Sequence, residues 1–114
     1  ECNFGKFEGK NHSDLDGNEY YQKWIDSMGE LPFPDGESMA EFKKRSVSEF
    51  RKIMFWLENE NVNTAAFVVH GGTIMSILSE LGDEGKSYYD YITDNGEGFV
   101  CEWEDGKCRN IMRL

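Results

Sequence analysis

The run Ala65-Ala66-Phe67-Val68-Val69-His70-Gly71-Gly72 indicates the fold class of this sequence. Its first five residues are apolar without alternation, which is typical of a strand covered on both faces, as in a parallel sheet between helix layers. Thr73 to Leu81 has apolar residues at helical spacing and is followed by Gly82, a helix-stop signal. Strand, glycine turn and helix make up half of a βαβ unit. The sequence therefore predicts a three-layer α/β/α architecture.

His70 is a candidate functional residue because it stands at the carboxyl end of the predicted strand, where open α/β sheets bind ligands. Gly71 and Gly72 allow a ligand to approach the backbone closely. We expect the N–H groups of Gly72, Thr73 and Ile74 to face an anion, since a helix N-terminus favours negative charge. The pattern predicts a phosphate site at His70, Gly71 and Gly72, and a purely structural histidine is the alternative.

The remaining helices are predicted from caps and spacing. Residues 1–16 are polar and rich in glycine, so we expect an ordered loop, followed by a short helix over residues 19–27. Ser38 and Glu41 form an S-x-x-E capping box ahead of an apolar stripe that ends at Leu57, which predicts a helix over Ser38 to Asn59. A long amphipathic helix with its basic side chains in solvent follows from this pattern.

A hairpin is predicted over Gly98 to Met112, because Asp105-Gly106 is a preferred sequence for a two-residue type I′ turn. This register places Glu104 opposite Lys107 and Glu102 opposite Arg109. Cys101 is then diagonal to Cys108, which predicts free thiols. The inner face is expected to carry Phe99, Cys101, Trp103, Cys108 and Met112.

A buried strand over residues 65–69 needs strand neighbours, and the chain offers only the hairpin besides it. We therefore expect at least one parallel partner strand to be missing from residues 1–114. Dimerisation is one way to cover the exposed sheet edge.

Composition narrows the functional classes. The 114 residues correspond to one domain or part of one, and no apolar stretch approaches the roughly 20 residues that span a bilayer. Twenty-two acidic against twelve basic residues give a formal charge of -10, which disfavours nucleic acid and anionic membranes as partners. Three cysteines cannot all pair within the chain, so a reducing cytoplasm fits best. The absence of an initial Met leads us to expect a processed, trimmed or partial start.

No metal or organic cofactor is expected. His12 stands near Asp14 and Asp16, but a lone histidine in a polar loop is more often in contact with carbonyl groups or solvent than with a metal.

Four segments in order resemble the histidine phosphatase superfamily, the phosphoglycerate-mutase-like enzymes. Glu1 to Lys10 resembles its E-x-x-x-G-x-x-E-G segment, and Phe33 to Ser38 with Arg45 resembles its P-x-G-E-S … R segment. Val68 to Thr73 is similar to the family's V-V-H-G-G-T strand end, and Asn95 to Gly98 to the segment before its final strands. Within the family, the first of these segments is most similar to small α-ribazole phosphatases and broad phosphomonoesterases.

The resemblance implies roles for particular residues. His70 corresponds to the second histidine of the family, which donates to the transferring phosphoryl oxygens, and Glu1 to the acid that protonates the leaving alcohol. These roles suit phosphoryl transfer, which needs charge stabilisation and a proton for the leaving group. Glu8, Glu37 and Ser38 are interpreted as structural. The family's Arg-His-Gly tripeptide, which carries the phosphorylated histidine, is absent from residues 1–114.

The sequence thus predicts that residues 1–114 are the C-terminal portion of a single histidine phosphatase domain, acting on a small-molecule phosphate ester. The chain alone is expected to be inactive, because the nucleophile lies outside it. Two alternatives stay open at this point. One is a phosphotransferase of the phosphoglycerate mutase type, and the other is a non-catalytic phosphate-binding or interaction module.

Overall fold

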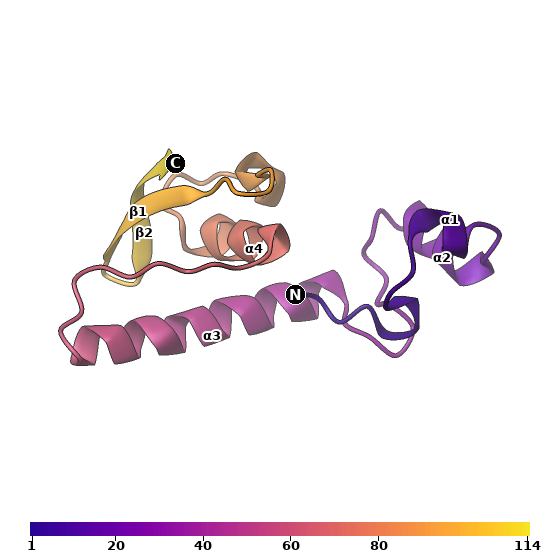
Figure 1. Ribbon diagram of the computed structural model, residues 1–114, viewed down its shortest axis with the longest axis horizontal. Helices are drawn as coiled ribbons and strands as arrows, with labels where there is room; N and C mark the ends of the chain where they lie inside the picture. The colour runs from indigo at the N-terminus through magenta and orange to yellow at the C-terminus, as the bar shows by residue number, and fades with distance from the viewer. The chain divides into compact units, whose positions relative to one another are not determined.

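The computed structural model describes all 114 residues (Figure 1). It divides into two compact units, residues 2–42 and residues 43–114 together with Glu1. The mixed helix and strand content agrees with the predicted α/β class, but the only sheet has two strands, and the three layers are not formed within this chain. The elements in chain order are η1 (Gly5–Phe7), α1 (His12–Leu15), α2 (Glu19–Asp26), α3 (Met39–Asn59), α4 (Gly71–Leu81), η2 (Tyr88–Tyr91), β1 (Phe99–Glu104) and β2 (Lys107–Arg113).

The unit of residues 2–42 is held together by aromatic side chains. Phe7 is buried, and its ring meets those of Tyr20, Tyr21 and Phe33 edge-on at 6.1–6.2 Å between centroids. Trp24 stacks on Phe33 at 5.0 Å. This segment is therefore a small core of its own.

The loop expected over residues 1–16 contains two short helical turns, so that prediction was wrong in detail. The second of these turns forms through local hydrogen bonds that the glycine-rich composition does not indicate. Asn11 accepts a hydrogen bond from the N–H of Asp14 at 3.0 Å, and the Asp14 carboxylate accepts one from the N–H of Asn11 at 2.9 Å. This capping box starts α1, the turn that contains His12.

Two glycines let distant parts of the first unit pack backbone against backbone. The N–H of Lys6 donates to the carbonyl of Pro34 at 2.7 Å, and the N–H of Glu37 donates to the carbonyl of Asn3 at 2.9 Å. A Cβ atom on Gly5 would overlap the Pro34 carbonyl, and one on Gly36 would overlap the Asn3 carbonyl. Packing thus explains Gly5 of the first family-like segment and Gly36 of the second.

The second unit has its core where α3, α4, η2 and the hairpin meet. Leu81 of α4, Tyr91 of η2 and Cys108 of β2 are each at most 1% exposed. Gly82 ends α4, and a Cβ atom there would overlap the carbonyl of Leu78 and lie 2.9 Å from the Tyr91 hydroxyl. The buried members of this cluster are Val47, Ile77, Leu78, Leu81, Tyr91 and Cys108.

The long helix has the predicted cap. The N–H of Ser38 donates to the Glu41 carboxylate at 3.0 Å, and the N–H of Glu41 donates to the Ser38 hydroxyl at 3.1 Å. From this cap α3 continues to Asn59, the predicted end. No helix in the structure combines the length and the apolar character needed to cross a bilayer.

The hairpin forms with the predicted turn and register. Asp105 and Gly106 have φ values of 51° and 73°, as a type I′ turn requires. Glu104 pairs with Lys107, and Glu102 pairs with Arg109. The three cysteines are free thiols, as predicted.

Two residues of the predicted inner face, Cys101 and Met112, are exposed, and Met112 lies on the opposite face. The register shifts between Val100 and Glu102, and Asn110 on the other strand has φ 51°, which marks a bulge. The bulge reverses the alternation beyond it, so Ile111 packs against the core, whereas Met112 is 62% exposed.

The strand predicted over Ala65 to Val69 is not formed. Residues 62–70 belong to no helix or strand, and residues 65–69 make no backbone hydrogen bond. Figure 1 shows this segment as the connection from the end of α3 back to the start of α4. An apolar sequence becomes a strand only when a neighbour pairs with its backbone, and β1 and β2 pair only with each other.

Candidate functional site

His70 is the N-cap residue of α4. Its φ and ψ of -70° and 152° are extended, and its imidazole makes no capping hydrogen bond, which leaves the side chain 66% exposed. The helix begins at Gly71, two residues before the predicted start. His70 therefore projects from the point where an extended segment becomes a helix.

The early start of α4 corrects one part of the expected anion site. The N–H groups of Thr73 and Ile74 donate to the carbonyl of His70 at 2.9 and 3.1 Å, so they do not face a ligand. Those of Gly71 and Gly72 have no such partner, as expected for the first residues of a helix. The amides at this helix end that can receive an anion are thus those of Gly71 and Gly72.

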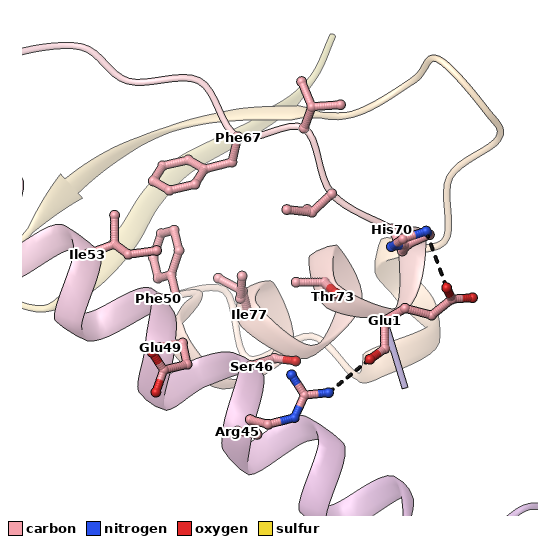
Figure 2. Close-up of a pocket in the computed structure, with 12 residues that line it drawn as sticks. Glu1, Arg45, Ser46, Glu49, Phe50, Ile53, Phe67, His70, Thr73 and Ile77 are labelled. Atoms are coloured by element: carbon pink, nitrogen blue, oxygen red, sulfur yellow. Dashed lines mark hydrogen bonds and ion pairs between the residues drawn. The ribbon is translucent and has the colours of Figure 1, made fainter. Parts of the chain in front are cut away.

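The structure brings Glu1 to His70, although 68 residues separate them in the chain. Oε2 of Glu1 lies 3.5 Å from Nε2 of His70, and the Glu1 side chain is 54% exposed (Figure 2). An acid and an imidazole at this distance can share contact with one bound group. Both remain accessible to solvent, and therefore to a substrate.

Arg45 fixes the backbone of Glu1. Its Nη2 donates a hydrogen bond to the carbonyl oxygen of Glu1 at 2.8 Å, from the second turn of α3 (Figure 2). From the sequence, Arg45 is recognised only as part of a motif, without a predicted role. The signal that could have identified it is the same motif, because an arginine placed a fixed distance after a helix cap reaches a fixed point beside the helix.

A hollow of about 290 Å³ extends from the Glu1–His70 pair over α3 and α4. Its polar end contains Glu1, Arg45, His70 and Thr73, and Glu49 lies further along its rim (Figure 2). The opposite wall is apolar, and Phe67 packs on Phe50 within it with ring centroids 5.2 Å apart. The apolar lining residues are Phe50, Ile53, Phe67, Val68, Val69 and Ile77.

The residues interpreted as structural form local hydrogen bonds. The Glu8 carboxylate accepts from the N–H of Phe4 at 2.8 Å, and Ser38 caps α3. Tyr20, Tyr21 and Trp24 belong to the aromatic cluster of the first unit, while Met28 is 88% exposed. Nowhere does the structure contain three or more histidine, cysteine, aspartate or glutamate side chains grouped as a metal site.

Comparison with known proteins places the sequence in a family. The family model described as "Histidine phosphatase superfamily (branch 1)" matches residues 1–112. The chain belongs to the histidine phosphatase superfamily. The resemblance seen in four separate segments is thus confirmed over nearly the whole sequence.

A curated relative of this histidine phosphatase superfamily chain is a protein of Hydrogenobacter thermophilus named "Putative phosphoserine phosphatase 2". The two are 31% identical over 85 residues, which cover 68% of this chain and 37% of the relative. The chain therefore matches only a little over a third of the relative's length. No solved structure matches it.

Proposed function

We propose that residues 1–114 are the C-terminal portion of a three-layer α/β/α phosphomonoester hydrolase that works through a phosphohistidine formed by a residue outside this chain. The contact between Oε2 of Glu1 and Nε2 of His70, at 3.5 Å beside the first amides of α4, carries this proposal. Family membership supports the reaction type. A cytoplasmic location is part of the proposal, supported by the three free thiols.

His70 and the amides of Gly71 and Gly72 receive the phosphoryl group in this proposal. In phosphoryl transfer, negative charge is spread over the equatorial oxygens, and donors already in place stabilise it without rearranging. His70 donates from its ring while the two amides donate from the helix end, where the dipole also favours an anion. These groups stabilise the negative charge that develops on the phosphoryl oxygens.

Glu1 acts as the general acid. An alkoxide is a poor leaving group, so cleavage of an alkyl phosphate requires a proton at the ester oxygen. A phosphate bound at His70 places its ester oxygen near a carboxyl group that lies 3.5 Å from the same imidazole. Arg45 holds the Glu1 backbone and so sets where that proton is delivered.

The substrate is a small phosphate ester. The hollow of about 290 Å³ beside the pair offers an apolar wall for the non-phosphate part. Two esters are chosen for testing. Phosphoserine is chosen because the name of the relative contains it. α-Ribazole phosphate is chosen because the segment Glu1 to Lys10 is most similar to the α-ribazole phosphatases.

The test compares the 114-residue chain with an extended protein, which we define as the same reading frame continued upstream of Glu1. We expect the extended protein to hydrolyse p-nitrophenyl phosphate and at least one of the two esters, releasing inorganic phosphate. His70→Ala is expected to lower its kcat by about 10²- to 10³-fold. His12→Ala, at the chain's other histidine, is the matched control and should leave kcat unchanged.

The same measurements separate the alternatives. Transfer of the phosphoryl group to a second hydroxyl compound, without release of inorganic phosphate, would show a mutase. An extended protein that binds phosphate without any turnover would show a non-catalytic binding module and reject the hydrolase. Light scattering of the same samples shows whether the protein dimerises.

A further inference from the structure

Two cysteines of the hairpin stand on one face of it, and neither lines the hollow that the phosphatase proposal uses. Trp103 pairs directly with Cys108, so Cys101, two residues before Trp103, is diagonal to Cys108 and on the same face. The two side chains are thus diagonal neighbours across the two strands. A disulfide between them requires the strands to shift, because diagonal positions lie farther apart than a relaxed disulfide usually spans.

The environments of the two sulfur atoms differ. Cys101 is exposed, whereas Cys108 is 1% exposed within the core cluster of the second unit. A reagent in solution therefore reaches Cys101 first. Cys108 can react only with a group that is already beside it.

We propose that Cys101 and Cys108 form a peroxide-sensitive thiol pair, in which Cys101 is oxidised first and Cys108 closes a disulfide across the hairpin. This is a modification site independent of the proposed phosphatase chemistry. The bulge at Asn110 lies between the paired positions on β2, where it alters the local twist and gives the strands room to adjust.

The chemistry balances in two steps. The Cys101 thiolate attacks one oxygen of hydrogen peroxide, the O–O bond breaks, and a sulfenic acid and hydroxide are formed. The Cys108 sulfur then attacks the Cys101 sulfur, the S–OH bond breaks, and a disulfide and water are formed. Overall, two thiols are oxidised by two electrons, one peroxide is reduced, and two water molecules are released.

The difference in acidity supports this order. Hydrogen bonding from Cys108 lowers the pKa of Cys101 to about 7, so much of it is the reactive thiolate at neutral pH. The pKa of Cys108 is raised, first by the same hydrogen bond and next by burial. Oxidation of Cys101 removes the first of these causes and makes Cys108 available as the resolving thiol.

The test treats the 114-residue chain with a small excess of hydrogen peroxide and follows its intact mass and free thiols. We expect the loss of two hydrogen atoms, a fall from three free thiols to one, and a Cys101–Cys108 cross-link in the peptide map. Cys2→Ser should retain the cross-link. Cys108→Ser should stop at a sulfenic acid on Cys101, which dimedone traps.

Three outcomes would overturn the proposal. They are three remaining thiols, dimers linked through Cys2, or over-oxidation of Cys101 in the unmutated chain without a cross-link. Circular dichroism of each variant before treatment shows that it is folded, so that a missing cross-link cannot be explained by a lost hairpin.

Discussion

Nη2 of Arg45 donates a 2.8 Å hydrogen bond to the carbonyl oxygen of Glu1. The bond holds the backbone of Glu1 and leaves the carboxylate to approach His70. A side chain of α3 thus determines where the proposed general acid stands relative to the start of α4. The effect of losing this hydrogen bond on a reaction should depend on whether the leaving group needs a proton.

Replacing Arg45 by alanine tests this dependence in the extended protein. We expect kcat for phosphoserine or α-ribazole phosphate to fall by about 10- to 100-fold, because a misplaced acid protonates an alkoxide poorly. p-Nitrophenolate leaves without a proton, so turnover of p-nitrophenyl phosphate should change little. Glu1→Gln should show the same pattern more strongly. Arg51→Ala, at an exposed arginine of the same helix, should change neither rate, and equal losses on both substrates would contradict the role of Arg45.

The 114-residue chain should not hydrolyse p-nitrophenyl phosphate. Its histidines are His12 and His70, and neither follows an arginine as in the family's nucleophile motif. His70 stabilises charge beside Glu1 in the proposed mechanism, and neither histidine stands in the nucleophile motif that would accept the phosphoryl group. A discontinuous assay at high protein concentration checks this. Turnover that disappears in His70→Ala and persists in His12→Ala would show that the chain is a complete enzyme.

Gly82→Ala should destabilise the second unit by about 1–3 kcal/mol, since the added methyl group overfills a packed core. The new Cβ atom would overlap the carbonyl of Leu78 and lie 2.9 Å from the Tyr91 hydroxyl. Urea unfolding followed by tryptophan fluorescence measures the change. Gly98→Ala is the matched control, because a Cβ atom there meets only the Leu114 side chain, at 3.5 Å. Equal midpoints for the two variants would show that Gly82 is not tightly packed.

Peroxide should modify Cys101 faster as the pH rises from about 6 to 8, with half of the maximal rate at about pH 7. Its pKa is lowered to about 7 by the Cys108 hydrogen bond, so the thiolate fraction increases across that interval. Among charged groups, Asp83 raises the pKa of Cys108 and Lys107 lowers it. In Cys108→Ser, which weakens the hydrogen bond, the midpoint should move toward the ordinary value of 9.0. Stopped-flow rates measured between about pH 6 and 8 in both proteins test this shift of the midpoint. Identical pH–rate profiles would refute it.

The features predicted correctly from sequence are those set by neighbouring residues. Asp105-Gly106 determines a type I′ turn, and the turn determines the register of Glu104 with Lys107. Ser38 and Glu41 start α3 through hydrogen bonds three residues apart. Each of these signals is complete within a few residues, so no tertiary contact is needed to interpret it.

The incorrect predictions depended on distant or weakly signalled contacts. Ala65 to Val69 has the composition of a strand but lacks a partner for its backbone in this chain. The bulge at Asn110 depends on one left-handed residue within an otherwise regular strand pattern. Likewise, no rule of residue spacing predicts that Glu1 lies beside His70. That pairing came from family resemblance, and Arg45, which holds Glu1, received no role at all.

The exposed apolar connection between α3 and α4 also affects how the isolated chain behaves in solution. Val68 is fully exposed, and residues 65–69 present free amides and carbonyls along an apolar surface, the combination that promotes intermolecular β-stacking. The formal charge of -10 opposes such association by mutual repulsion. Colloidal stability of the 114-residue chain is therefore lowest near its isoelectric point of about 4.6, and it decreases as added salt screens the repulsion.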